Sequence, residues 1–193
     1  MSEKPIFEGR FLSLTTKTIL KEALNDERVA LQALGILAER KDEDAIEAIR
    51  RIGCAYGEEV ALRALEILRE RKYDYVDDKV YAIGYKHGGK VALEALEILN
   101  ENWDDVITPS FIDDIMYEYG GEVAKKSLDI LKEHKGRGVT VLIGKIGIEC
   151  PELKNQVNDI LLDRVTKKMD DRKNIEDVFK NLNAQNSYSV PCL

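Results

Sequence analysis

The sequence predicts an all-α protein, an α-solenoid built from four to five antiparallel helix pairs. The first observation is a nine-residue string that occurs as Val60–Leu68 and again, almost unchanged, as Val91–Leu99. The second is that each copy follows another segment with helical spacing of apolar residues, with glycine between the two. A fixed period of about 31 residues is typical of proteins in which successive repeats stack on one another.

The string occurs five times, with decreasing similarity toward the C-terminus. Val29–Leu37 precedes the Val60 copy by one period, and Val123–Leu131 follows the Val91 copy at nearly the same spacing. An eroded fifth copy, Leu153–Leu161, comes after a slightly shorter interval. These five segments are expected to be the second helices of the pairs.

A helical projection of the string explains why the copies should stack. At 100° per residue the apolar positions cover an arc of about 220°, far wider than the ~100° stripe of an ordinary surface helix. In the Val60 copy only Arg63 and Glu66 point away from this arc. Such a helix must contact neighbours on both flanks as well as its own partner.

The first helices and their ends are also visible in the sequence. The expected first helices are Thr15–Leu24, Asp44–Gly53, Asp77–Gly84, Phe111–Tyr117 and Val139–Gly147. Glycines are expected to end these helices in the left-handed conformation, at Gly53 and Gly57, Gly88 and Gly89, Gly120 and Gly121, and Gly147. Pro109 and Pro151 are expected at first helical positions, where the missing N–H costs nothing.

The C-terminal end is expected to close the stack. The fifth second helix continues through residue 168, and a short separate helix at residues 175–182 is predicted to cap it. Residues 1–182 are therefore expected to be a single domain. Residues 183–193, rich in Asn and Ser, are expected to form a flexible tail.

Composition and charge restrict the class of protein. Hydrophobic residues make up 44% of the 193 residues, enough for a continuous core, and the net charge of −7 argues against a general nucleic-acid binder. Three distant cysteines, Cys54, Cys150 and Cys192, favour a reducing compartment over a disulfide framework or a zinc site. There is neither a signal-peptide pattern nor an apolar run of ~20 residues. A cytoplasmic protein without a membrane role is expected.

The repeat resembles a known family. The pattern Gly-x-x-Tyr/His-Gly-x-x-Val-Ala-Leu-x-Ala-Leu, seen from Gly53 and again from Gly84, is similar to the short HEAT-like repeats, a group that includes the phycobilisome-lyase-type repeats. The resemblance covers residues 15–165 and implies a HEAT-like superhelix. Tetratricopeptide repeats fit less well, because they need a 34-residue period with Trp, Gly and Tyr at set places.

The polar ridge of the second helices is the candidate recognition surface, because such helices usually line the concave face of a stack. Positions four and seven of the copies are Gln32 and Gly35, Arg63 and Glu66, Glu94 and Glu97, Lys126 and Asp129, then Gln156 and Asp159. One interpretation is a mixed-charge groove, acidic in the middle, that holds a peptide or a basic partner. The alternative is a solvated face with neighbouring opposite charges. The predicted partner-binding residues are Arg63, Glu66, Glu94, Glu97, Lys126 and Asp129, with Trp103 in the connection that interrupts the repeat.

Two further series have both a functional and a structural interpretation. Basic residues follow the second helices, at Arg40, Lys41, Arg69, Arg71, Lys72, Lys132, Lys135 and Arg137, and could form an edge for RNA or DNA. The alternative is that these cations, at the C-termini of helices, complement the helix dipoles. This interpretation is favoured, because it also explains the acidic residues at the start of the following helices. Tyr56, His87 and Tyr119 share one position and could form a recognition ladder. A packing role is the simpler account.

Signals for catalysis are weak. His87 and His134 are the candidates for a general base, and neither has a Ser or Cys in a familiar arrangement. HEAT-like hydroxylases bind iron through repeated His-Glu pairs, whereas His87 is followed by Gly and His134 by Lys. No catalytic residue, metal or cofactor is therefore predicted.

The sequence thus predicts a non-catalytic scaffold or adaptor whose partner is another protein or a peptide. The alternatives are a nucleic-acid-binding HEAT-like protein that uses the basic inter-repeat edge, and a HEAT-like lyase-type accessory enzyme. Self-association also stays open, because the ends of such stacks expose apolar faces.

Overall fold

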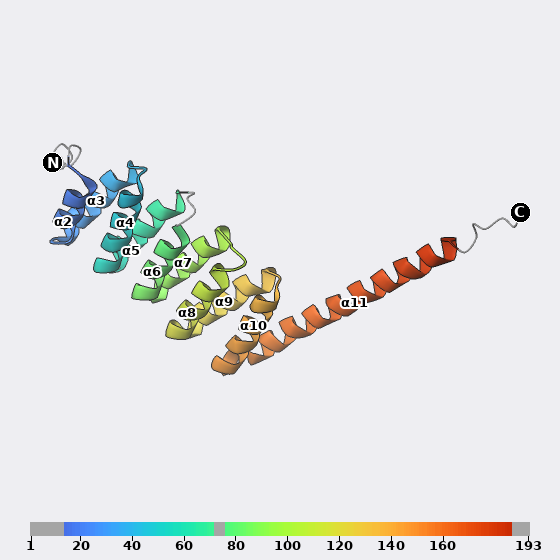
Figure 1. The fold of residues 1–193 in the computed structure, drawn as a ribbon. Coiled ribbons are helices and arrows are strands. Elements are labelled where there is room, and N and C mark those ends of the chain that lie inside the picture. Colours follow the sequence, from blue (N-terminus) through green and yellow to red (C-terminus); the bar gives the residue numbers. More distant parts are fainter. Residues whose placement is uncertain (1–13, 72–75, 187–193) are drawn as a thin grey trace, which may run out of the picture. The chain divides into compact units, whose positions relative to one another are not determined.

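A computed structural model of the chain describes residues 14–71 and 76–186, with side chains as far as Asp170 (Figure 1). Over these ranges it contains ten α-helices, one short 3₁₀ helix and no β-strand. The chain divides into two compact units, residues 1–142 and residues 143–193.

The first unit consists mainly of four helix pairs. They are α2 (Thr16–Ala23) with α3 (Glu27–Ala38), α4 (Glu43–Ala55) with α5 (Glu58–Arg69), α6 (Val76–His87) with α7 (Gly89–Glu101), and α8 (Thr108–Tyr119) with α9 (Gly121–Glu133). Helix α10 (Arg137–Glu149) begins in this unit and ends in the second. Every first and second helix expected from the repeat is present, so the all-α prediction is confirmed.

Helices of the same kind pack against each other in sequence order within this unit. The first helices contact one another as α2 with α4, α4 with α6 and α6 with α8. The second helices do so as α3 with α5, α5 with α7 and α7 with α9. Contacts on both flanks are what the wide apolar arc requires. In α5 they bury six of the nine residues of the repeated string: Val60, Ala61, Ala64, Leu65, Ile67 and Leu68.

The helices begin in two different ways, after a side-chain N-cap or after a glycine turn. Early in the chain, side chains cap the helices: Asp26 Oδ1 accepts from the Arg28 backbone N–H at 2.8 Å, and Asp42 Oδ1 from that of Ala45 at 2.9 Å. The later second helices begin after glycines in the left-handed region, Gly88 at φ 67° and Gly120 at φ 55°. A side chain at either glycine would strain the backbone, so glycine makes these tight turns possible.

The prediction that Gly53 and Gly147 end their helices is wrong. Both lie inside helices, α4 and α10. A Cβ at Gly53 would lie 2.8 Å from the Ala64 Cβ of the partner helix, and one at Gly84 would lie 2.4 Å from that of Ala95. These glycines therefore allow the two helices of a pair to approach each other closely, a role that depends on a residue of the other helix.

The second unit contains the end of α10, the 3₁₀ helix η1 (Pro151–Leu153) and α11 (Lys154–Asn186). The predicted separate capping helix at residues 175–182 is wrong, because these residues belong to α11, a single helix of 33 residues. No glycine or proline interrupts residues 154–186, so nothing in the local sequence stops the helix. Helix α11 extends into the expected tail at 183–193 as far as Asn186, and residues 187–193 lie outside the described part.

None of the helices in the described ranges has the combination of length and apolar character that a membrane span needs.

Candidate functional site

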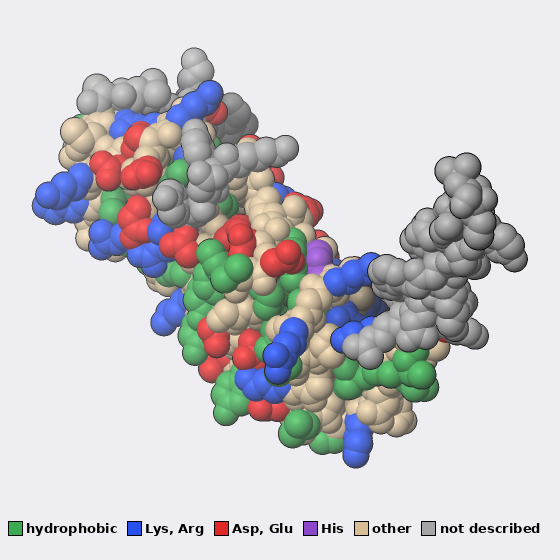
Figure 2. Space-filling view, turned by 45° about the vertical axis from the view of Figure 1, so that its right-hand side comes forward, with side chains coloured by type: hydrophobic (Ala, Val, Ile, Leu, Met, Phe, Trp, Pro, Cys, Tyr) green, Lys and Arg blue, Asp and Glu red, His purple; other side chains and the backbone are tan. Residues whose placement is uncertain are grey.

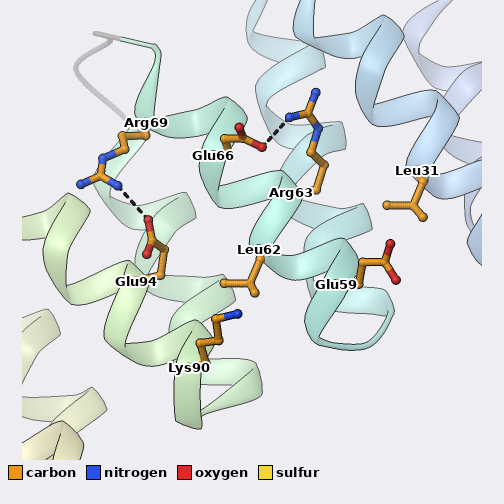
Figure 3. A pocket seen from close by; sticks show the side chains of 8 residues that line it. All are labelled: Leu31, Glu59, Leu62, Arg63, Glu66, Arg69, Lys90 and Glu94. Carbon is orange, nitrogen blue, oxygen red and sulfur yellow. Dashed lines mark hydrogen bonds and ion pairs between the residues drawn. The ribbon is translucent and has the colours of Figure 1, made fainter.

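A shallow, open depression lies on the surface of three neighbouring second helices in the first unit (Figure 3). Its volume is about 710 Å³. Two half-buried leucines, Leu31 on α3 and Leu62 on α5, provide its apolar surface. Charged side chains complete the lining: Glu59, Arg63, Glu66 and Arg69 from α5, and Lys90 and Glu94 from α7.

The leucines reach this surface because of their place in the repeated string. Leu31 and Leu62 are its third letter, at one edge of the apolar arc, and Leu93 is the equivalent residue on α7. All three are half-buried rather than fully buried, although the projection counted this position with the core. The fourth copy has Lys125 here, and that side chain is exposed. The third position of the string therefore lies at the border of the core and the surface, and a leucine there leaves part of its side chain accessible to solvent.

Arg69 joins α5 to the next second helix through ion pairs. Its guanidinium lies 2.8 Å from Glu94 Oε1 and 4.0 Å from Glu97 Oε2, and it also donates to Glu101. The hydrogen bond to Glu101 raises the pKa of Arg69, and the same bond lowers the pKa of Glu101. Three carboxylates of α7 thus form ion pairs with one arginine of α5, so this side chain links two adjacent repeats.

The other predicted ridge residues are also in ion pairs. Arg63 pairs with Glu66 on α5, as Figure 3 shows. Lys126 Nζ lies 2.7 Å from Glu97 Oε1, and Asp129 Oδ1 lies 2.8 Å from Lys132 Nζ. All these groups are partly exposed, where such a pair contributes about 0–1 kcal/mol.

The structure brings three of the predicted residues together at the depression. They are Arg63, Glu66 and Glu94. Glu97, Lys126 and Asp129 do not line it. The prediction missed Leu31, Leu62, Glu59, Lys90 and Arg69, which do. For Arg69 a signal existed, because its partner carboxylates lie roughly one repeat further along the chain, where the next second helix should pass.

Trp103 does not line the depression. Its indole stacks on the His134 imidazole with ring centroids 3.5 Å apart and planes at 4°, and its Nε1–H donates to Asp105 Oδ1 at 2.8 Å. His134 Nε2 lies 2.8 Å from Asn100 Oδ1, and burial lowers the pKa of His134. In the same connection Val106 is 84% exposed. Trp103 therefore joins the irregular connection to the end of α9.

The aromatic series Tyr56, His87 and Tyr119 contacts the backbone of the preceding pair. Tyr56 Oη donates to the Ala23 carbonyl at 2.6 Å, His87 Nε2 lies 2.7 Å from the Gly53 carbonyl, and Tyr119 Oη donates to the carbonyl of Tyr85. Each carbonyl is in the last turn of a first helix, where backbone acceptors lack intrahelical donors. The geometry supports the packing account, because the polar atom of each ring is engaged within the protein.

Two of the arginines that follow second helices are held in a similar way. Arg71 Nη2 donates to the carbonyls of Leu37, at 2.5 Å, and Ala38, at 3.0 Å, at the end of α3. Arg40 Nη1 donates to Thr16 Oγ1 at 2.9 Å. Arg71 is thus engaged by the preceding pair and Arg40 by the first helix of its own pair, which reduces what these guanidiniums could offer to phosphate. On the face that Figure 2 shows, acidic and basic side chains are interspersed with hydrophobic ones.

The described residues contain no group of three or more His, Cys, Asp or Glu side chains placed to hold a metal ion. Burial raises the pKa of the Cys54 and Cys150 thiols, which disfavours the reactive thiolate at neutral pH. At the depression, ion pairs engage Arg63, Glu66, Arg69, Lys90 and Glu94, and the lining contains no Ser, Thr, Cys or His.

Comparisons with known proteins add little. No family model matches the chain, and no curated protein matches it. Among solved structures, the chain is similar to a de novo designed 16-helix transmembrane nanopore determined by cryo-EM, with 18% sequence identity and a TM-score of 0.19. The match covers 90% of this chain and 66% of that chain, so this chain spans just under two thirds of the designed chain's length. A TM-score this low carries no argument about fold or function.

Proposed function

We propose that the protein is a HEAT-like α-solenoid that acts as a non-catalytic scaffold in the cytoplasm, and that its depression over α3, α5 and α7 binds a peptide segment of another protein. The observation that carries the proposal is the pair of half-buried leucines framed by charged side chains. An apolar centre with a polar rim is the usual anatomy of a protein interface.

The lining indicates what the segment should carry. Leu31 and Leu62 offer apolar area to one or two aliphatic side chains. Around them lie three carboxylates and three cations, so flanking charges of both signs can be matched by exchange of partners within the existing ion pairs. Because the pairs are partly exposed, breaking them costs little.

The nucleic-acid alternative is weaker, because Arg40 and Arg71 already donate hydrogen bonds to groups of other helices within the protein. The lyase-type alternative has no residue in the described part of the chain to support it.

The test uses a substitution that the protein itself tolerates elsewhere. Lys125 occupies the third position in the fourth copy, so Leu62→Lys should fold while it places a charge at the centre of the depression. Leu93→Lys is the matched control, since it is the same change at the same position of the next helix, outside the lining. Partners captured by the wild-type protein are identified by mass spectrometry, and the affinity for the strongest is measured with each variant.

We expect Leu62→Lys to weaken that binding about 10-fold or more, the consequence of one lost leucine contact, and Leu93→Lys to leave it within about 3-fold. If the two variants bound the partner with equal affinity, the depression would not be part of the binding interface.

A further inference from the structure

A cluster of aromatic side chains lies on the first helices α6 and α8, on elements that do not line the depression. The ring of Tyr81 stacks on that of Phe111 with centroids 4.4 Å apart and planes at 8°, and the Tyr85 ring lies 5.6 Å from Tyr81. Tyr85 is 41% exposed, and Tyr117 on α8 is 66% exposed. Both side chains are therefore accessible to a partner from the solvent.

This aromatic content is local to two repeats. One repeat earlier, on α4, the positions of Tyr81 and Tyr85 are occupied by Arg50 and Cys54. The repeat as such therefore does not require tyrosine at these places. Exposed tyrosine is enriched at interfaces, because its ring gives a large contact area while its hydroxyl remains hydrated.

The charge around the cluster has one sign on α8. That helix carries Asp113, Asp114 and Glu118 and no lysine or arginine. Tyr81 Oη donates to Asp114 Oδ2 at 3.1 Å. Burial, together with this hydrogen bond, raises the pKa of Tyr81 to about 12, so the phenol keeps the proton that it donates to Asp114 at physiological pH. Helix α6 carries two lysines: Lys79 is held by Asp78 at 2.7 Å and by Glu47 at 3.8 Å, and Lys86 is exposed in the last turn.

We propose that this face, formed by Tyr81, Tyr85, Phe111, Asp114, Tyr117 and Glu118 and termed the tyrosine face, docks an arginine-bearing segment of a partner protein. A guanidinium stacks on tyrosine rings and pairs with carboxylates in the same plane. Lysine fits less well, because its ammonium is a compact, strongly hydrated charge without a planar face. Phosphate would be repelled by the carboxylates of α8.

The probe is a capped pentapeptide, glycine-arginine-glycine-arginine-glycine, titrated into the full-length protein and followed by NMR of the tyrosine ring resonances. The comparison peptide has lysine in place of both arginines. Glu118→Gln removes one charge from the tyrosine face. Glu122→Gln is the matched control, because it removes one exposed charge from the first turn of α9. Tyr117→Ala removes an exposed ring.

We expect the arginine peptide to shift the Tyr85 and Tyr117 resonances and to bind at least about 3-fold more tightly than the lysine peptide. Glu118→Gln and Tyr117→Ala should each raise the dissociation constant about 3- to 5-fold, while Glu122→Gln leaves it within about 1.5-fold.

Two results would overturn the assignment. One is equal affinity for the arginine and lysine peptides, and the other is an equal effect of Glu118→Gln and Glu122→Gln. Either would mean that the acidic protein attracts cations without a specific surface. The outcome is independent of the depression, since Leu62→Lys should leave this binding unchanged.

Discussion

At the scale of single residues, the most informative side chains join one repeat to the next at places where the backbone needs a partner. Tyr56 and His87 each engage a carbonyl in the last turn of the preceding first helix. Arg71 does the same at the end of a second helix. Helix C-termini carry carbonyls without intrahelical donors, so these contacts satisfy groups that would otherwise need water. Side chains that look available in the sequence are therefore already engaged.

The stack of Trp103 on His134 predicts a pH dependence of stability. Burial lowers the pKa of His134 below its ordinary value of 6.5 in the folded protein, although the nearby Asp105 and Glu133 act in the opposite direction. A histidine with a lowered folded pKa binds protons more readily in the unfolded chain. Its contribution to stability is therefore complete above pH 6.5 and is lost as the pH falls through the folded pKa.

The measurement is the melting temperature as a function of pH for the wild-type protein and for His134→Phe, which keeps a ring against Trp103 and cannot titrate. We expect the wild-type protein to lose stability relative to the variant as the pH falls below 6.5. Parallel curves for the two proteins would show that His134 titrates alike in the folded and unfolded chains.

At the scale of the helix pair, packing depends on small residues at one crossing. Gly53 meets Ala64, and in the next repeat Gly84 meets Ala95. The backbones approach so closely there that no side chain fits on the first helix. A glycine inside a helix costs about 0.5–1 kcal/mol relative to alanine, and the close contact of the two helices offsets this cost.

Gly84→Ala tests this crossing. The added Cβ would lie 2.4 Å from the Ala95 Cβ, so one helix must move, and we expect a loss of about 1–3 kcal/mol in the free energy of unfolding. Gly35→Ala on α3 is the matched control, because no atom lies within 4 Å of its Cβ position. It should be neutral or stabilising by up to about 1 kcal/mol.

Urea denaturation gives both free energies. Equal effects of the two substitutions would mean that helix propensity dominates and that the crossing tolerates a methyl group.

At the scale of the whole molecule, the described contacts run between neighbouring elements. Helix α2 contacts α3 and α4, whereas α4 contacts α2, α3, α5 and α6. In repeat proteins of the proposed kind, stability is approximately a sum of repeat and neighbour terms. Helices in the middle of the first unit therefore have more partners to lose on opening than those at its beginning.

Hydrogen exchange of the backbone amides checks this gradient, and the near-identical copies provide their own control. We expect Val60–Leu68 and Val91–Leu99 to exchange about 10-fold more slowly than Val29–Leu37, after correction for intrinsic rates. The copies differ little in sequence, so a difference in protection would come from their neighbours. Uniform protection would instead indicate that the first unit opens as one cooperative block.

The candidate site illustrates how far the sequence allows prediction. The positions of Arg63, Glu66 and Glu94 on the outer face of the second helices followed from periodicity alone, because a helix places each residue at a known angle. The exposure of Leu62 could not be predicted in this way. Its angle puts it at the edge of the apolar arc, and the neighbouring helices determine whether a residue at the edge is covered. Arg69 also required the neighbour, since its charge partners are on the next repeat.

The sequence by itself determined the helices of the first unit and their pairing, because the period and the apolar arc are local properties of the chain. Only the tertiary structure decided which glycines end a helix and which lie at a helix crossing, since that depends on an alanine of the partner helix. It also decided which surface leucines border a depression and which charges are already paired. The physical reason is that exposure and pairing are properties of two or more elements together, whereas periodicity describes one.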